Sequence, residues 1–448
     1  MSFERQTLQR KLAELAGLAG APRRYVVAFS GGLDSTVLLH ALALSRDAAA
    51  PPLLAVHVDH GLHSDSAAWC RHCRSFAQSL GVEFIDMAVR IPGRSGHGAE
   101  AAAREARYNA LRSVVEHGDW LLSAHHKDDQ AETLLLNLMR GSGPAGLAGI
   151  AAVRPFADAW LVRPMLDVSR AALREYADAQ GLAWIDDPSN EDQQFDRNYL
   201  RHDIMPRLEN RWPGVIDRIR RSATLAGEAS QLLDQLADAD YRRLGTRPDR
   251  LELTGLRALG PERQRNVLRY VVRETGLPSP PAAQLQSVIT DLIPARDDAQ
   301  PVVQWPGAEV RRYRDNVYIL TPWAAAQYGA VVPIPGDCAA QTIALHAGLG
   351  ELHFEPDAPR GLADAVVRAG LEVRFRSGGE EIKPVGQSHT RKLKKLLQEE
   401  GVVPWMRERL PLLYSGDALV AVADLWIAAA AASEPGLGVH WRNRPALH

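Results

Sequence analysis

Residues 30–35, Ser-Gly-Gly-Leu-Asp-Ser, place two glycines, two hydroxyls and a carboxylate between an apolar run and a helical pattern. Glycine lets backbone N–H groups approach a phosphate closely, and the start of a helix attracts negative charge. Asp34 would repel phosphates unless a cation lay between them, and Mg²⁺ binds through a carboxylate together with phosphate oxygens. The stretch therefore predicts a phosphate site with Mg²⁺ at Asp34. The simpler alternative is a helix start in which Asp34 and Ser35 act as caps.

A second group of reactive side chains, His125, His126 and Asp128, crowds the beginning of the stretch 123–150. Their spacing fits no zinc pattern, so we expect a catalytic or cation-binding role for Asp128. Asp129 and Glu132 are predicted to be the N-cap and N3 residues of the helix that follows.

Both groups need a framework that brings them together, and the apolar pattern predicts one. Strands are expected at 25–29, 53–58, 82–89, 120–123 and 160–163, and helices at 34–45, 65–80, 99–117, 128–140 and 169–180. This alternation is typical of an α/β fold with a doubly wound parallel sheet. Ligands of such sheets bind at the carboxyl ends of the strands, which is where both groups fall.

The pattern changes further along the chain. Residues 216–275 read as helices, 277–310 are rich in proline and alanine, and 331–448 mix short strands with a basic helix at 389–400. We therefore expect three domains: an α/β domain at 1–215, a helical middle domain at 216–330 and a small α+β domain at 331–448.

Composition limits the classes of function. The chain has 448 residues, 46% of them hydrophobic, and a formal net charge of −2. A nucleic-acid partner would therefore have to bind local basic patches. Three cysteines fit a reducing cytoplasm, the N-terminal stretch lacks the apolar segment of a signal peptide, and no apolar run is long enough to span a membrane.

The hexapeptide at 30–35 resembles the SGGxDS loop of the ATP pyrophosphatases, enzymes that convert ATP into AMP and pyrophosphate. The resemblance implies an adenine nucleotide alpha hydrolase-like fold in which this loop holds the pyrophosphate part of ATP. It implies the following ATP-binding residues: Ser30, Gly31, Gly32, Leu33, Asp34, Ser35 and His57. Asp34 and Asp128 are the catalytic candidates.

Further stretches resemble one family within this group, the tRNA(Ile)-lysidine synthetases. They are HVDHGLH (57–63), EAAAREARYNAL (100–111), HHKDDQAET followed by RGSGPAGLAG (125–149), VRPMLDVSR (162–170), DDPSNEDQQFDRNYLRHDIMPRL (186–208) and the basic segment 374–414. The resemblance implies ligation of L-lysine to C2 of cytidine 34 in the CAU anticodon of isoleucine tRNA, through an adenylated cytidine. AMP and pyrophosphate would be released.

The resemblance also implies that RNA contacts lie in three segments, and each has a plainer alternative. The residues are Arg104, Arg107 and Tyr108; Arg197, Asn198 and Arg201; and Lys392, Lys394, Lys395 and Arg407. Arginine and tyrosine suit phosphates and stacked bases, and asparagine suits a base edge. The alternatives are a Glu100–Arg104 ion pair, an Asx turn before a helix at 197, and a solvated amphipathic helix at 389–400.

Other functions stay open at this point. A tRNA-thiolating ATP pyrophosphatase would need reactive cysteines, but Cys70 and Cys73 fall within a predicted helix and are expected to be buried. A small-molecule amidotransferase would leave the basic segment unexplained, and a non-catalytic tRNA-binding protein would not need Asp34. A homodimer is possible.

Overall fold

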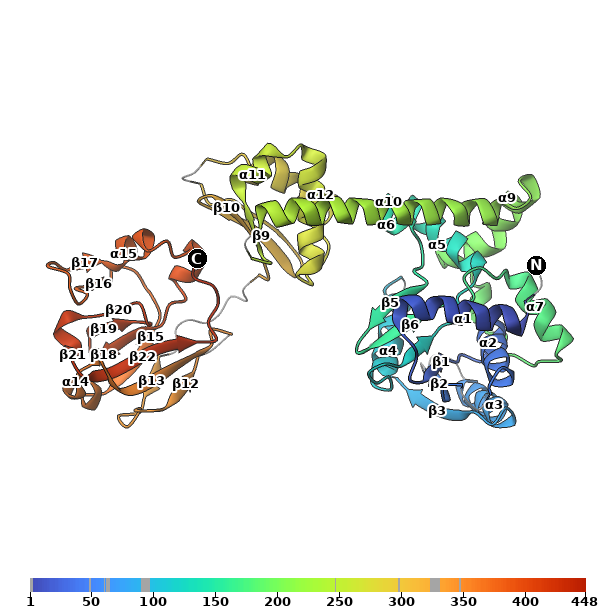
Figure 1. Cartoon of the computed structure of the whole chain (residues 1–448), viewed down its shortest axis with the longest axis horizontal. Helices are drawn as coiled ribbons and strands as arrows, with labels where there is room; N and C mark the ends of the chain where they lie inside the picture. The colour runs from blue at the N-terminus through green and yellow to red at the C-terminus, as the bar shows by residue number, and fades with distance from the viewer. Residues whose placement is uncertain are drawn as a thin grey trace. The chain divides into compact units, whose positions relative to one another are not determined.

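The computed structural model describes residues 3–47, 50–59, 61, 65–89, 97–245, 247–296, 299–322, 331–345 and 348–448; for residues 97–101 it describes the backbone alone. The chain forms two compact units, Met1–Leu233 and Asp234–His448. Their division falls within the long helix α10 (Val215–Leu244), and Figure 1 shows the elements of each unit. The predicted division into three domains stays a prediction.

The first unit is built on a six-stranded sheet in the order β3-β2-β1-β4-β6-β5. The strands are β1 (Tyr25–Ala28), β2 (Leu53–Asp59), β3 (Glu83–Ala88), β4 (Trp120–Leu122), β5 (Val153–Phe156) and β6 (Ala159–Val162). Neighbours pair in parallel except β5, which is antiparallel to β6. The predicted doubly wound parallel sheet is confirmed. The strand order reverses between β1 and β4, and ligands of such sheets bind at this point.

Successive residues of a strand point to opposite faces of the sheet, and both faces of this sheet are covered. Val27 packs into the larger core, together with residues of α1, α2, α3 and α7. Its neighbour Val26 packs into the smaller core on the other face, together with Leu111 of α4. Burial on both faces explains why β1 reads as a continuous apolar run rather than an alternating one.

Helices precede, connect and follow the strands of the first unit (Figure 1). They are α1 (Arg5–Ala19), α2 (Leu33–Leu44), α3 (Ser66–Ser79), α4 (His97–Arg112), α5 (Lys127–Met139), α6 (Pro144–Leu147), α7 (Arg170–Ala179), α8 (Asp196–Tyr199) and α9 (Met205–Arg211), with short turns η1 (Pro188–Glu191) and η2 (Leu200–Ile204). Helix α2 is buried along almost its whole length. Helix α4 ends at Arg112, five residues before its predicted end, and β5 was not predicted.

The second unit begins with helices and an antiparallel sheet. The predicted helical region is confirmed in α10, α11 (Leu253–Ala258) and α12 (Pro261–Glu274), and α13 (Ala282–Ser287) and η3 (Val288–Leu292) follow. A sheet in the order β7-β10-β9-β8 packs with them around one core. Its strands are β7 (Arg250–Glu252), β8 (Val302–Trp305), β9 (Ala308–Tyr313) and β10 (Asn316–Leu320). This sheet was not predicted.

A second core in the same unit lies under two five-stranded sheets. One contains β11 (Val332–Ile334), β15 (Leu371–Arg374), β18 (Leu412–Ser415), β19 (Ala418–Val422) and β20 (Trp426–Ile427). The other contains β12 (Thr342–Ala344), β13 (Glu351–Ala358), β14 (Gly361–Leu362), β21 (Ala432–Ser433) and β22 (Gly436–Arg442). The pair β16 (Glu381–Ile382) and β17 (Arg391–Lys392), with α14 (Asp364–Arg368), α15 (Leu393–Glu399), α16 (Pro404–Arg407) and η4 (Ala429–Ala431), completes the predicted α+β character.

Candidate active site

The loop between β1 and α2 has the geometry of an anion site. Gly31 has a φ of 83°, and a Cβ there would lie 2.6 Å from Cys73 Sγ, so only glycine fits. Ser35 Oγ donates to Gly32 O at 3.0 Å and lies 3.1 Å from Ser30 Oγ. The first-turn N–H groups of α2 have no acceptor within their helix. The loop therefore gathers backbone N–H donors and two serine hydroxyls on one short arc.

Asp34, in the first turn of α2, holds an unsatisfied oxygen. Its Oδ2 lies 3.6 Å from His126 Nε2, whereas Oδ1 is buried and has no hydrogen-bond partner among the described residues. Burial raises the pKa of Asp34, although the charge of His126 opposes this. A buried acceptor without a partner is costly, and a bound cation would satisfy it.

The residues around Asp34 fit Mg²⁺ rather than a metal held by protein alone. Among the described residues, no group of three or more His, Cys, Asp or Glu side chains could hold a metal ion. Mg²⁺ usually takes one or two carboxylates and completes its coordination with phosphate oxygens and water. The single oxygen Asp34 Oδ1 matches that requirement.

The second reactive group lies at the start of α5, one position earlier than predicted. The helix begins at Lys127, and the N–H of His126 donates to Asp129 Oδ2 at 2.9 Å. The prediction that Asp129 is the N-cap was therefore wrong: His126 holds that position and Asp129 is N3. A carboxylate can cap a helix from either of two positions: from N3 it accepts the N-cap N–H, and from the N-cap position it accepts the N–H of N3. The sequence pattern alone could therefore not tell whether Asp129 is the N-cap or N3.

The carboxylate of Asp128 lies beside the imidazole of His126. His126 Nδ1 lies 3.4 Å from Asp128 Oδ2, and that oxygen also accepts the N–H of Arg170 at 2.9 Å, in the first turn of α7. Burial alone would lower the pKa of His126, but the carboxylates of Asp128, Asp129 and Asp34 raise it. Asp128 thus joins α5 to α7.

A buried network of acids and arginines ties α5 to α8 and η2. Glu132, 1% exposed, accepts from Arg197 Nε at 2.8 Å and from Arg201 Nε at 2.7 Å. Asp129 Oδ1 accepts from Nη2 of the same two arginines at 3.0 and 3.2 Å. Burial alone would raise the pKa of Asp129, but His126 and Arg197 lower it to about 2. The arginines are held in place by charge-assisted bonds.

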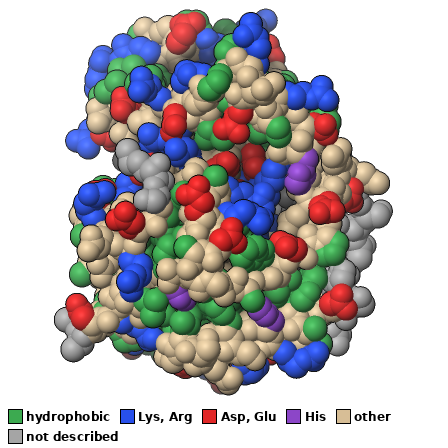
Figure 2. Space-filling view, turned by 90° about the vertical axis from the view of Figure 1, so that its right-hand side faces the viewer, with side chains coloured by type: hydrophobic (Ala, Val, Ile, Leu, Met, Phe, Trp, Pro, Cys, Tyr) green, Lys and Arg blue, Asp and Glu red, His purple; other side chains and the backbone are tan. Residues whose placement is uncertain are grey.

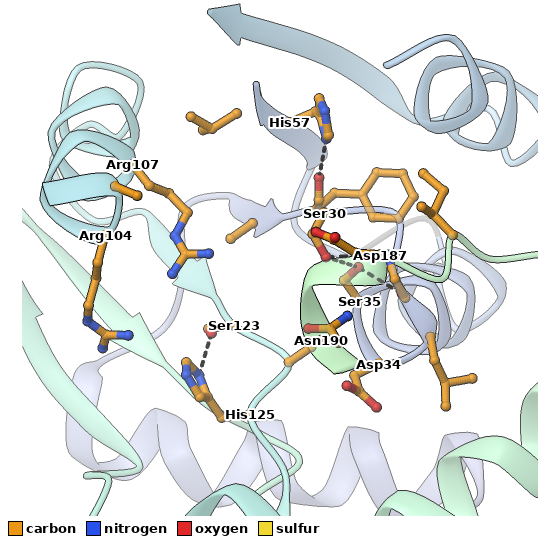
Figure 3. A pocket seen from close by; sticks show the side chains of 18 of the residues that line it. Ser30, Asp34, Ser35, His57, Arg104, Arg107, Ser123, His125, Asp187 and Asn190 are labelled. Atoms are coloured by element: carbon orange, nitrogen blue, oxygen red, sulfur yellow. Dashed lines mark hydrogen bonds between the residues drawn. The ribbon is translucent and has the colours of Figure 1, made fainter. Parts of the chain in front are cut away.

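These groups surround one cavity of about 720 Å³ at the carboxyl ends of β1, β2 and β4. The predicted residues that line it are Ser30, Gly32, Leu33, Asp34, Ser35, His57, Arg104, Arg107, Tyr108, Arg197, Asn198 and Arg201. Gly31 and Asp128 are not among the lining residues. In Figure 3, Ser30, Asp34 and Ser35 lie on one side, Arg104 and Arg107 on the other, and Ser123 and His125 between them.

Two predicted ligand residues in the cavity already have partners. His57 Nδ1 lies 3.0 Å from Phe29 O, which can only accept, so this nitrogen donates. The Asn198 amide donates to Ser189 O and Asp192 O, both at 2.9 Å. The two bonds of Asn198 fix the loop before α8. The contacts of His57 with ATP and of Asn198 with RNA stay predictions.

Three residues that line the cavity, Ser123, Asp187 and Asn190, were not predicted, and His125 was noted in the sequence without a role. His125 Nδ1 lies 2.6 Å from Ser123 Oγ, and burial lowers the pKa of His125 to about 3. His125 is therefore neutral at physiological pH. The paired histidines and the DDPSN stretch were visible in the sequence, but only the fold brings them to the cavity.

The predicted basic segment lies in the second unit. The helix expected at 389–400 is the shorter α15, in which Leu393, Leu396 and Leu397 are buried. Lys392, Lys394 and Lys395 are exposed. Arg407 is half-buried and donates to Val402 O at 2.8 Å and to the Tyr313 hydroxyl at 2.7 Å. Figure 2 shows a different face, on which Lys and Arg side chains gather in a hollow beside acidic ones.

The three cysteines are free thiols. Cys73 is fully buried, as predicted, and burial raises its pKa to about 12. Cys70 is only half-buried, so the prediction of a buried thiol was wrong for this residue. A thiol with so high a pKa is a poor nucleophile, and the role of Cys73 is to pack beneath Gly31.

Three family models match successive parts of the chain. They are a PP-loop domain at residues 4–208, a TilS substrate binding domain at 251–318 and a TilS substrate C-terminal domain at 371–441. A tRNA(Ile)-lysidine synthase of Alkalilimnicola ehrlichii is 43% identical over 96% of this chain and 95% of that protein. The chain belongs to the tRNA(Ile)-lysidine synthase family.

Other members of the family match over nearly the same length. The protein of Yersinia pseudotuberculosis is 41% identical over 91% of each chain, and that of Coxiella burnetii is 38% identical over 90% of this chain and 89% of that one. The solved U34-tRNA thiolase NcsA from Methanococcus maripaludis, with its [4Fe-4S] cluster, covers 49% of this chain and 77% of its own at 18% identity and a TM-score of 0.39. Among the described residues, no helix is both long and apolar enough to cross a membrane.

Proposed function

We propose that the chain ligates L-lysine to C2 of cytidine 34 in the CAU anticodon of isoleucine tRNA, with ATP converted to AMP and pyrophosphate. Membership of the tRNA(Ile)-lysidine synthase family supports this function. One structural observation supports it further. The loop 30–35 and the start of α5 open into the same cavity, at the point where the strand order reverses.

The loop 30–35 would hold the pyrophosphate part of ATP. Its backbone N–H groups, Ser30 and Ser35 face the cavity at the positive end of α2, where phosphate charge is stabilised. The loop lacks the lysine used to hold β- and γ-phosphates during γ-phosphoryl transfer. This fits a reaction at the α-phosphate in which pyrophosphate leaves.

Mg²⁺ would be held by Asp34 Oδ1 and would offset the charge that builds up on the phosphates during displacement. Asp34 itself lies between the anion loop and the His126–Asp129 cluster. Without a cation, its carboxylate would oppose the binding of pyrophosphate. Because Mg²⁺ and pyrophosphate would have to bind at the same place, an acidic residue within a phosphate loop is explained.

The reaction would proceed in two displacements. The C2 oxygen of cytidine 34 forms a bond to the α-phosphorus, and the bond from that phosphorus to pyrophosphate breaks. The lysine ε-amine then forms a bond to C2 and loses a proton, while the C2–O bond breaks and AMP leaves. An ammonium of pKa about 10.4 must be deprotonated before it attacks.

The two predicted catalytic aspartates would differ in role. Asp34 lines the cavity, whereas Asp128 is bonded to the N–H of Arg170 and lies beside His126. We assign Asp128 to the positioning of His126 and α7. The homodimer and the cytoplasmic location inferred from the sequence stay predictions.

The function is tested by incubating the protein with ATP, labelled lysine and unmodified isoleucine tRNA, followed by nucleoside analysis. We expect label at position 34 and one AMP for each lysine incorporated. Sulfur incorporation instead would favour the thiolating alternative, and tRNA binding without AMP would favour a non-catalytic protein.

The role of Asp34 is tested by Asp34→Ala, with Asp158→Ala as control because Asp158 is exposed in the turn between β5 and β6. We expect Asp34→Ala to lower AMP formation by at least a hundredfold, on the order of the loss of one strong electrostatic group at a reacting centre. The control should keep wild-type turnover. Full activity of Asp34→Ala would exclude the proposed role.

A further inference from the structure

Tyr108 on α4 is surrounded by four arginines that come from three different elements. The guanidinium carbons of Arg104, Arg154 and Arg107 lie 5.1, 5.5 and 5.9 Å from the centre of its ring. Arg104 and Arg107 belong to α4 and Arg154 to β5, and Arg163, the fourth arginine, directly follows β6. The antiparallel strand β5 thus adds a basic residue that the parallel part of the sheet does not supply.

Arg163, which is buried, is fixed in place. Arg163 is 3% exposed, its Nη1 donates to Ala151 O at 2.6 Å, and its Nε is buried without a hydrogen-bond partner among the described residues. Burial alone would raise the pKa of Tyr108, yet the four arginines together lower it. Burial and the charges of Arg154 and Arg104 likewise lower the pKa of Arg163, although Tyr108 opposes them. Arg104 and Arg107 line the cavity, so this concentrated positive charge reaches its wall.

Gathering like charges costs free energy, and stacking of the guanidiniums on an aromatic ring recovers only a small part of that cost. An anion that binds between the arginines would remove the repulsion. The loop 30–35 already has its own donors and lies on the other side of the cavity (Figure 3), so the arginines do not serve the pyrophosphate.

Exposure indicates which anion binds. Arg104 and Arg154 are both exposed, whereas Tyr108 is half-buried and Arg163 is buried. A small substrate with a carboxylate, such as lysine, would be enclosed by the side chains that bind it. Arg104 and Arg154 instead face solvent. A polymer whose base enters the cavity leaves its backbone phosphates at the rim, where outward-facing guanidiniums can bind them.

We propose that Arg104 and Arg154, arranged around Tyr108, bind the sugar–phosphate backbone of the RNA beside the nucleotide that enters the cavity, and that the buried Arg163 adds positive charge without touching the RNA. This site rests on the proposed function, and it adds Arg154 to the RNA contacts. Tyr108 acts as the platform that spaces the guanidiniums. Its ring also packs against Phe156 at 5.7 Å, so this aromatic surface is used within the protein rather than for stacking a base.

The test measures binding of unmodified isoleucine tRNA to the whole chain between 50 and 300 mM salt. Arg154→Ala is suitable because Arg154 is exposed, and Arg10→Ala is the matched control because Arg10 is an exposed arginine of α1 outside the cavity. One lost phosphate contact lowers the slope of log Kd against log salt by about 0.7 for single-stranded RNA, which is about a fivefold weaker affinity at 0.1 M salt. Arg104→Ala with Arg154→Ala should double the change in slope.

Three outcomes decide the proposal. A reduced slope for Arg154→Ala, with ATP binding and the Arg10→Ala control unchanged, supports it. A wild-type slope in the double variant overturns it. A higher KM for lysine with an unchanged tRNA slope also overturns it and assigns the arginines to the lysine carboxylate. If the wild-type protein itself incorporates no lysine, the proposed function fails instead, and the salt slopes still show whether the site binds RNA.

Discussion

Of the three segments predicted to contact RNA, two place their basic side chains in opposite surroundings. In the first unit, Arg197 and Arg201 are bonded to the buried carboxylates of Glu132 and Asp129. In the second unit, Lys392, Lys394 and Lys395 project into solvent above buried leucines of α15.

The difference separates two uses of positive charge. Paired arginines hold a defined position, because each guanidinium forms directed bonds to a fixed carboxylate. Exposed lysines keep their hydration and flexibility, so they attract a polyanion without fixing its geometry. We therefore expect the first region to control the shape of the cavity and the second to control affinity and its dependence on salt.

The largest expected effect comes from Glu132→Gln, which leaves two arginines facing a neutral amide. Breaking a buried ion pair from one side costs roughly 3–5 kcal/mol of unfolding free energy. Urea unfolding measures this change. The matched control is Glu116→Gln, because Glu116 pairs with Arg23 at 2.6 Å with both side chains more than half exposed, and such a pair contributes at most about 1 kcal/mol. Equal losses in the two variants would contradict the structural role of the network.

A smaller effect is expected when Lys392, Lys394 and Lys395 are all changed to Ala. Affinity for the proposed tRNA substrate should fall roughly a hundredfold at 0.1 M salt, and the salt slope should fall by about 2. Unfolding free energy should not change, because these side chains are exposed. Arg368→Ala, which removes an exposed charge paired with Asp364, is the control. If the triple variant were less stable and kept the salt slope of the wild-type protein, the lysines would be structural and would not contribute to affinity.

The smallest expected effect concerns His125, at the wall of the cavity. Its pKa is about 3 in the folded chain and about 6.5 when unfolded, so acid protonates the unfolded state first. The stability that depends on a neutral His125 is complete above pH 6.5 and is lost as the pH falls toward 3. Between pH 7.5 and 5.0 the loss is about 2 kcal/mol. His125→Gln should show less loss over this interval, and the same pH dependence in both proteins would contradict burial of the imidazole.

The sequence predicted the elements that carry strong local signals. The strand, loop and helix around residues 25–44 were correct, because an apolar run, two glycines and a helical pattern each have a local cause. The sheet formed by β7, β8, β9 and β10 was not predicted, because its strands are short and β8 lies in a segment rich in proline and alanine. The cap of α5 was misplaced because a carboxylate can act as the N-cap or, as Asp129 does, accept the N-cap N–H from position N3.

The sequence by itself determined the chemistry available to this protein: an anion loop with a carboxylate, two histidines beside acids, and a set of arginines and lysines. It also determined the class of the sheet, since alternation of apolar runs and helical patterns is a local property of the chain. Only the tertiary structure decided which of these charges meet. Arg154 comes to Arg104 because β5 turns back beside β6, and Arg197 comes to Glu132 because α8 packs on α5. Such pairings join residues that are 50 or more positions apart in the sequence. They arise from the packing of whole elements, which local sequence patterns do not predict.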